Sequence, residues 1–481
     1  MKKARRNSCN GSGPVHLPPD VVQRIATFIM DASEFFTFLD AFQGTSISLG
    51  TLQHLWMASF HSPFHMLWPE LHVDEVSAAR VARLETDRTY FKTIHVHAVY
   101  DLEILHSCVS ATTSLSLYTC PLASEVDVPL ETWYQRLAGL PISHLTWLKG
   151  PFRGVPQCMD PLVAVLPQMS LLTTIDLSNA CVSSLEGLFD YIRDSKLTRL
   201  SLCNVTTIQN GTAPVYMASL LHRAELASLA HWLATQPVTA FAMSKWSVPN
   251  NQKVLFQFYD ALWTCPTLHK FAATTQLLPH LDAYSFTTPL QIVHLSLTNC
   301  GLTANTASNL ANAIAGSKVE WLDLSNNNIG FVGMHSLSVL GLRRSNVRQL
   351  FVNSCDLLDA GCSHLANVLP NTSLELVSLE KNQITDMSVM FLGFVLRTFT
   401  TLSSLHLRSN EVTITGAHAL IESLGMRPCD VTHVVDLDDN LIDDVDQDTL
   451  ETLAAKQPAL KDCAFSCAAS FASQDFDEND E

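Results

Sequence analysis

Apolar and polar positions along most of this chain repeat with a period of about 28 residues. Each copy opens with aliphatic residues at the first, fourth, sixth and eleventh positions, usually leucine, and has a polar or small residue at the ninth. The clearest copies open at Ile292, Val319, Val347, Leu374, Leu402 and Thr432. Their successive openings are 27, 28, 27, 28 and 30 residues apart. A regular period of this length indicates a repeat architecture.

A second apolar pattern follows each strong copy. Leucine stands eight residues after the eleventh position, most copies have a small residue halfway between, and another aliphatic residue often follows about one helical turn later. This spacing predicts an amphipathic helix. Each unit is therefore expected to contain a short strand, a turn and a helix. Because one such unit cannot bury its apolar side alone, stacked units must share a core.

Weaker copies of the pattern run upstream. They open near Thr112, Ile142, Leu172, Leu197, Val238 and Leu268. With the six strong copies they predict about twelve repeats over residues 111–460, and Thr93–Val99 has the pattern of a thirteenth strand. The wider spacing after Leu197 predicts an extra loop at Thr206–Pro214.

These motifs resemble the ribonuclease-inhibitor-like leucine-rich repeats over roughly residues 110–455. The resemblance implies an α/β leucine-rich-repeat solenoid, a horseshoe with a parallel sheet on its concave face and helices outside. It also gives Cys120, Cys300 and Cys355 at ninth positions a structural role in the turn after the strand, which agrees with the frequent burial of cysteine. The chain departs from the family pattern at Gln276, where Asn or Cys is expected.

Residues 16–72 follow a different pattern. Leu17-Pro18 precedes a stretch with apolar residues at helical spacing, namely Val21, Ile25, Phe28 and Ile29. Asp31 and Glu34 have the spacing of a capping box before a second, phenylalanine-rich helix. A third apolar stretch contains Trp56. We therefore expect a small N-terminal module of three helices, followed over residues 73–110 by a linking helix and a first strand or cap.

The N-terminal module resembles an F-box-like module placed before leucine-rich repeats. The resemblance implies docking onto the Skp-type adaptor of a cullin–RING ubiquitin ligase, with Leu17, Pro18, Ile25, Phe28 and Trp56 as the docking residues. The alternative interpretation is a helical cap that covers the open end of the solenoid, which repeat arrays need for solubility.

Composition narrows the class of protein. Only 16% of the residues are charged, against about 25% in an average soluble domain. The net charge of −17 argues against a broad surface for nucleic acid or an anionic membrane. Disordered ends are expected, basic over residues 1–15 and acidic over 461–481. No apolar stretch is typical of a signal peptide or membrane span, so we expect a cytoplasmic or nuclear protein with reduced cysteines.

Signatures of catalysis and metal binding are weak. The usual nucleotide-binding, zinc-protease and serine-hydrolase motifs are absent from the sequence. His54, His61 and His65 share one stretch without an accompanying carboxylate or cysteine, and we interpret them as packing or surface residues. The segment from Asp436 begins like a calcium loop but has Leu441 where glycine is required. We therefore predict no catalytic, cofactor-binding or metal-binding residues, and a protein that is not an enzyme.

In this repeat class the strand residues between the core positions face the concave surface. Exposed aromatic and arginine residues grouped on such a surface are typical binding anchors. Those expected to bind a protein target are Trp321, Arg348, Phe351, Leu376, His406 and Arg408. Trp321 and Phe351 stand at nearby positions of adjacent strands, so their rings are expected to lie close together.

The favoured function is a non-catalytic adaptor, monomeric outside its complex, that recruits a protein target to a cullin–RING ubiquitin ligase. The first alternative is a free-standing scaffold or inhibitor whose N-terminal helices only cap the solenoid. The second is a GTPase-activating protein of the Ran type, a family that combines this repeat class with an acidic segment like Asp475–Glu481.

Overall fold

The computed structural model describes residues 18–43, 48–74, 90–109, 112–148, 158–208, 219–399, 401–427, 433–457 and 460–464. The chain divides into two compact units. The first comprises residues 1–148 and 160–175, and the second comprises residues 149–159 and 176–481. Among the described residues, no helix has the length and apolar character that crossing a membrane requires.

The first unit contains the N-terminal module and the first repeat strands. Its helices are α1 (Pro19–Ala26), α2 (Ala32–Asp40), α3 (Leu52–Ala58), η1 (Phe64–Met66), α5 (Leu102–Cys108), α6 (Leu130–Leu137), α7 (Asp160–Val165) and η3 (Leu166–Gln168). Its strands are β1 (Leu71–Val73), β2 (Thr93–Val96), β3 (Ser114–Leu117) and β4 (Ile142–Leu148). The four strands pair in parallel, each with its neighbour in sequence.

Three helices form the N-terminal module, as its sequence pattern predicts. The Asp31 side chain accepts a hydrogen bond from the Glu34 backbone N–H at 2.8 Å and caps α2. Phe35 stacks on Trp68 with ring centroids 4.0 Å apart. The buried residues of α1 are Val22 and Ala26, whereas most of the apolar stripe read from the sequence lies on its outer side. The spacing therefore identified the helix but not its buried face.

The second unit contains most of the repeats. Its helices are α8 (Glu186–Asp194), α9 (Arg223–Thr235), α10 (Gln252–Thr264), α11 (Ala304–Ile314), α12 (Gly330–Ser336), η4 (Leu337–Gly341), η5 (Leu342–Arg344), α13 (Leu358–Val368), η6 (Leu369–Asn371), α14 (Asp386–Leu396), α15 (Ile414–Gly425) and α16 (Asp444–Ala454). Its strands are β6 (Cys181–Val182), β7 (Arg199–Cys203), β8 (Thr206–Thr207), β9 (Ala240–Ser244), β10 (Lys270–Thr274), β11 (His294–Thr298), β12 (Trp321–Asp323), β13 (Gln349–Phe351), β14 (Leu376–Ser378), β15 (Ser404–His406), β16 (His433–Asp436) and β17 (Leu460–Ala464). Strand β5 (Thr174–Ser178) has residues in both units.

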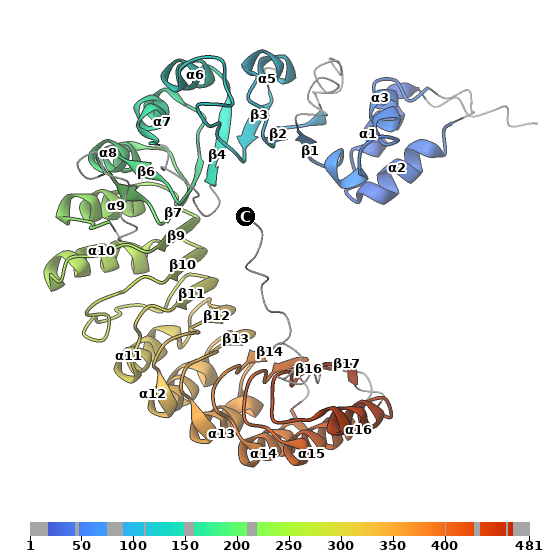
Figure 1. Ribbon diagram of the computed structural model, residues 1–481, viewed down its shortest axis with the longest axis vertical. Helices are drawn as coiled ribbons and strands as arrows, with labels where there is room; N and C mark the ends of the chain where they lie inside the picture. The colour runs from blue at the N-terminus through green and yellow to red at the C-terminus, as the bar shows by residue number, and fades with distance from the viewer. Residues whose placement is uncertain are drawn as a thin grey trace, which may run out of the picture. The chain divides into compact units, whose positions relative to one another are not determined.

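Strands β7, β9 to β17 lie side by side in sequence order and form a long parallel sheet, with the helices of the second unit on one side of it (Figure 1). The middle residues of six consecutive strands are in register and buried on the helix side; they are Leu295, Leu322, Leu350, Val377, Leu405 and Val435. Each predicted repeat supplies one strand. This confirms the α/β leucine-rich-repeat solenoid with outer helices.

A ladder of buried amides follows the strands. In Asn382, the side-chain oxygen accepts hydrogen bonds from the backbone N–H groups of Cys355 and Leu357, at 2.9 and 3.3 Å. Its amide nitrogen donates to the carbonyls of Val352 and Glu380, at 2.8 and 3.1 Å. Equivalent ninth-position residues make the same kind of bonds between repeats; they are Asn327, Asn410 and Asn440.

The non-asparagine ninth positions fit the same scheme. The buried thiol of Cys300 donates to the Ala273 carbonyl at 3.2 Å, and that of Cys355 donates to the Leu324 carbonyl at 3.3 Å. Burial raises the pKa of both thiols to about 12, so they remain protonated and unreactive near neutral pH. Gln276 accepts from the backbone N–H of Trp246 at 2.8 Å and donates back to its carbonyl, so it replaces the expected asparagine.

Carboxylates link successive helices at their N-termini. Asp359 in α13 accepts hydrogen bonds from the backbone N–H and hydroxyl of Thr385, at 2.9 and 2.7 Å, and from the Ser388 hydroxyl. Asp386 in α14 makes the equivalent bonds to Thr413 at 2.8 and 2.6 Å. These links hold adjacent repeats in register on the helix side.

Two boundaries differ from those predicted. Within the segment expected to loop out, Thr206–Thr207 forms strand β8 and pairs with β6, while residues 209–214 lie outside the described residues. The tail expected to be disordered from 461 begins instead with strand β17, which pairs with β16 and ends at Ala464. The basic end over residues 1–15 and the acidic end beyond 464 lie outside the described residues.

Candidate functional site

The side of the second unit's sheet that faces away from its helices is here called the open face. Successive residues of a strand point to opposite sides of a sheet, so the residues flanking each buried middle position face outward. On strands β12 to β16 and the residues beside them, this places a set that we call the C-terminal patch. It comprises Trp321, Asp323, Arg348, Phe351, Glu375, Leu376, Ser378, Glu380, Ser404, His406, Arg408, Asp436, Asp438 and Asp439.

An aromatic pair lies at the start of the C-terminal patch. The rings of Trp321 and Phe351 are in contact, with centroids 5.2 Å apart and planes inclined by 43°. His294 on the preceding strand lies 6.3 Å from the Trp321 ring. Both rings of the pair are half-buried, so they still offer apolar surface to another molecule. The structure thus confirms the ring proximity that the sequence predicts, and Leu376 adds a half-buried aliphatic side chain on β14.

Each arginine of the patch is held by one carboxylate. Nη1 of Arg348 lies 2.8 Å from Oε1 of Glu375, and both side chains are largely exposed. Nε and Nη2 of Arg408 lie 2.8 and 2.7 Å from Oδ2 of Asp439. Exposed ion pairs contribute little to stability, about 0–1 kcal/mol. Their value to the site is that they hold two guanidinium groups in place on an otherwise acidic surface.

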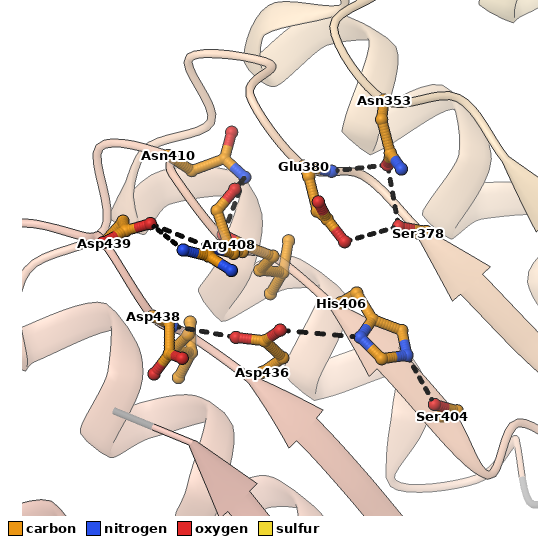
Figure 2. Close-up of polar contacts among 12 residues, drawn as sticks. Asn353, Ser378, Glu380, Ser404, His406, Arg408, Asn410, Asp436, Asp438 and Asp439 are labelled. Carbon is orange, nitrogen blue, oxygen red and sulfur yellow. Dashed lines mark hydrogen bonds and ion pairs between the residues drawn. The ribbon is translucent and has the colours of Figure 1, made fainter. Parts of the chain in front are cut away.

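Hydrogen bonds fix the acidic side of the patch on strands β14 and β15 (Figure 2). Oδ1 of Asn353 accepts from the Ser378 hydroxyl at 2.7 Å and from the backbone N–H of Glu380 at 2.8 Å. Ser378 also lies 3.2 Å from the Glu380 carboxylate. On β15, Nε2 of His406 lies 2.9 Å from the Ser404 hydroxyl.

His406 connects this network to the next repeat. Its Nδ1 lies 3.7 Å from Oδ2 of Asp436, whose other oxygen accepts from the backbone N–H of Asp438 at 3.0 Å (Figure 2). Desolvation alone would raise the pKa of Asp436. The hydrogen bonds from His406 and from the Asp438 backbone outweigh it and lower the pKa, which keeps this carboxylate charged.

Two groups among the described residues have the geometry of metal ligands, although the sequence analysis predicted no metal-binding residues. Ligand atoms of Glu380, His406 and Asp436 lie within 4.8 Å of one another, and so do those of Glu70, His72 and His95 in the first unit. The Glu380 group belongs to the C-terminal patch, where an ammonium or guanidinium group of a partner is an equally suitable counter-ion.

Neither group contains the residues that the sequence singled out for metal binding. His54, His61 and His65 are exposed and belong to neither group. The calcium interpretation of the segment from Asp436 also fails, because Asn440 is buried in the amide ladder. The two groups escaped the sequence analysis because their ligands come from different strands, more than 20 residues apart.

The predicted docking residues of the N-terminal module fall into three classes. Leu17 lies outside the described residues, and Pro18 is exposed at the start of α1. Ile25 is 43% exposed and Phe28 is 84% exposed. Trp56 is half-buried and packs edge-on against Phe60 at 4.7 Å. The structure therefore leaves the apolar residues of α1 accessible to a partner.

Further apolar side chains are exposed that the sequence analysis did not select. In the N-terminal module they are Met30, Met57, Phe60 and Phe64. On the outer side of α14 they are Met387, Met390 and Phe394, at the spacing of one helical stripe. The signal in the sequence was the nearly uninterrupted apolar run of α14, which is apolar on more than its buried side.

Comparison with known proteins identifies the kind of repeat. No protein-family model matches the chain. It is 35% identical over 99 residues to mouse ribonuclease inhibitor, a match that covers 20% of this chain and 22% of that protein. It is 36% identical over 106 residues to human NACHT, LRR and PYD domains-containing protein 5, covering 21% and 9%. Over 166 residues it is 30% identical to rat NACHT, LRR and PYD domains-containing protein 3, covering 28% and 16%.

Solved structures of low sequence identity also align with the chain. The complex of Rad7 and Elc1 in yeast aligns at 15% identity and a TM-score of 0.47, covering 94% of this chain and 95% of that one. An internalin from Listeria monocytogenes aligns at 14% identity and a TM-score of 0.36, covering 87% and 94%. The TLR13–ssRNA13 complex aligns at 14% identity and a TM-score of 0.36, covering 79% and 50%.

The sequence matches establish ribonuclease-inhibitor-like homology in the leucine-rich repeats. The chain spans less than a quarter of the length of the curated relatives it matches. The F-box-like resemblance of the N-terminal module stays a prediction.

Proposed function

We propose that this protein is an interaction adaptor that binds a protein partner on the C-terminal patch of its open face. The observation that carries the proposal is the contact between Trp321 and Phe351 on adjacent strands, beside two arginines held in place by carboxylates. Aromatic and arginine side chains supply most of the binding energy at typical protein interfaces. The rigid sheet fixes these anchors before the partner arrives, which lowers the entropy cost of association.

The charges of the patch define the partner further. Arg348 and Arg408 are each matched by one carboxylate, and Asp323, Glu380 and Asp436 add negative charge. An acidic surface attracts a basic one and raises its association rate, an effect that salt weakens. The expected partner presents an apolar side chain for the aromatic pair and lysine or arginine residues beside it.

The second part of the proposal concerns the N-terminal module. Its exposed apolar residues, above all Phe28, are costly in a free monomer and suited to a protein interface. With the F-box-like pattern of the sequence, this favours docking of the module onto the Skp-type adaptor of a cullin–RING ubiquitin ligase. The protein would then recruit the partner held on its open face to that ligase.

Two alternatives remain open beside this one. In a free-standing scaffold or inhibitor the module would cap the repeats and bind no ligase adaptor. A Ran-type GTPase activator would accelerate GTP hydrolysis by its partner, which a single hydrolysis assay with a Ran-type GTPase tests directly.

A co-purification experiment separates the adaptor from the scaffold. The full chain is mixed with purified Skp-type adaptor, and a Phe28→Ala/Ile25→Ala variant is compared with the wild type. We expect a stable complex with the wild type and at least tenfold weaker binding by the variant. The outer-face variant Met390→Ala/Phe394→Ala, which removes a similar exposed apolar area, is the matched control and should bind the adaptor normally. No complex with the wild type would leave the scaffold as the better interpretation.

A further inference from the structure

Four histidines and a tyrosine gather on adjacent strands of the first unit. His72 in β1 lies opposite His95 in β2 in the parallel register, and their rings stack with centroids 4.6 Å apart. His97, two residues further along the chain, stacks on His72 at 5.3 Å and on Tyr118 at 4.8 Å. His144 in β4 meets the edge of Tyr118. We call this set, with Glu70, the histidine cluster.

Hydrogen bonds orient the two central rings. Nδ1 of His72 lies 3.0 Å from Nε2 of His97, and Nδ1 of His95 lies 2.9 Å from the Tyr118 hydroxyl. Both Nδ1 atoms are therefore occupied by neighbours, which leaves the Nε2 atoms of His72 and His95 available to a ligand. Support of this kind from a second layer of residues is typical of metal-binding histidines.

One nitrogen of the cluster is poorly satisfied. His95 is only 9% exposed, and its Nε2 is buried without a hydrogen bond. The nearest ionic group is Oε2 of Glu70, which lies 3.1 Å away but outside hydrogen-bond geometry. A buried nitrogen that faces a carboxylate across a gap of this size is suited to a cation placed between them.

We propose that Glu70, His72 and His95 bind a divalent transition-metal ion of the zinc type. Their ligand atoms lie within 4.8 Å of one another. Zinc binds imidazole nitrogen and carboxylate oxygen at about 2.0–2.2 Å, so a modest closure of these atoms suffices. The Glu70 side chain is 64% exposed and can make that movement, while the strands hold the two imidazoles in place.

The protonation states favour the same ligand set. Burial, followed by the neighbouring His95 and His97, lowers the pKa of His72. Burial also lowers the pKa of His95; Glu70 opposes this, while His97 and His144 add to it. Both imidazoles are therefore neutral near pH 7, the form that binds metals. Two nitrogens and one oxygen are ligands that suit zinc better than calcium or magnesium, which prefer oxygen alone.

Three protein ligands leave the fourth position of a tetrahedral ion open. A water molecule or a side chain of a partner can fill it. The ion would also join β1, which follows the N-terminal module, to β2. Because metal binding to a folded site stabilises the fold by mass action, this strand pair is expected to become more stable when zinc is present.

The test uses the full chain, kept reduced with a phosphine because the chain has thirteen cysteines. Zinc binding is measured by calorimetry, and cobalt is titrated as a spectroscopic probe of the ligands. We expect one site whose cobalt spectrum lacks the thiolate charge-transfer band. Glu70→Gln is the main variant, since its exposed side chain can be changed without disturbing the core, and it should weaken zinc binding at least tenfold. His72→Gln should abolish binding at this site.

His406→Gln serves as the matched control, because it removes the histidine of the Glu380 group and should leave the binding in the first unit unchanged. Circular dichroism of each metal-free variant verifies that the fold is retained. Equal stoichiometry and affinity in wild type and Glu70→Gln, or a cobalt spectrum dominated by thiolate, would overturn the proposal. Zinc binding lost only in His406→Gln would place the ion on the C-terminal patch instead and equally overturn it.

Discussion

The buried side and the open face of the second unit's sheet are built from alternate residues of the same strands. On the buried side, one residue type recurs at each position: an aliphatic residue in the middle of each strand and an amide or thiol at the ninth position. On the open face, neighbouring strands carry tryptophan, phenylalanine, leucine and histidine in turn. The difference teaches that the repeat dictates where the outward side chains lie, whereas their chemistry is free to serve a partner.

The largest effect is expected from removing a member of the amide ladder. Asn382→Ala deletes four hydrogen bonds of a fully buried side chain and leaves the backbone groups of Cys355 and Val352 without that partner. Each unsatisfied buried group costs about 1–3 kcal/mol, so we expect the free energy of unfolding to fall by about 3–5 kcal/mol. Urea unfolding followed by circular dichroism measures it.

Asn371→Ala is the matched control, since Asn371 is exposed at the end of η6. It should change the free energy of unfolding by no more than about 0.5 kcal/mol. Similar losses in the two variants would contradict the role of the ladder.

A smaller effect is expected on the helix side. Desolvation acts to raise the pKa of Asp359, but the hydrogen bonds from Ser388 and Thr385 outweigh it and lower the pKa. A carboxylate whose pKa is depressed by folding stabilises the protein above its unfolded pKa, and the contribution fades as the pH falls through the folded value. Asp359→Asn should therefore cost about 1–2 kcal/mol at pH 7 and progressively less below about pH 4.

Unfolding measured between pH 3 and pH 7 checks this dependence. The exposed Asp448, changed to asparagine, provides the comparison and should give no measurable loss at any pH in that range. A pH-independent loss in Asp359→Asn would show that shape rather than charge matters at this link.

The smallest effect on stability is expected on the open face. Arg348 and Glu375 are both largely exposed, so a double-mutant cycle with Arg348→Ala and Glu375→Gln should give a coupling energy below about 0.5 kcal/mol, decreasing with salt. A coupling above about 2 kcal/mol would mean that the open face, like the buried side, is under structural constraint.

The sequence predicted what depends on position along one strand and missed what depends on several strands. Regular spacing sufficed for the strands, for the buried ladder and for the proximity of Trp321 and Phe351, because a parallel sheet places equivalent residues side by side. The histidine cluster was missed because the short strand of His72 breaks the repeat pattern and its partner His95 lies 23 residues away.

Burial was also harder to predict than secondary structure. The apolar spacing of α1 identified a helix, but its buried face consists of Val22 and Ala26, since the small alanine allows close packing while Phe28 points outward. At Gln276 the sequence suggested a defect in the repeat. The longer amide reaches the same backbone groups of Trp246, and this could be seen only from the folded structure.

The most direct test of the account compares stability and binding in the variant Trp321→Ala/Phe351→Ala. Partners captured by the wild type are identified, and the affinity of one purified partner is measured for the wild type, for this variant and for the outer-face control Met390→Ala/Phe394→Ala. We predict that the free energy of unfolding falls by no more than about 2 kcal/mol, while affinity falls by about 30-fold or more in the Trp321/Phe351 variant alone. Unchanged affinity in that variant, or an equal loss in the outer-face control, would contradict the assignment of binding to the open face.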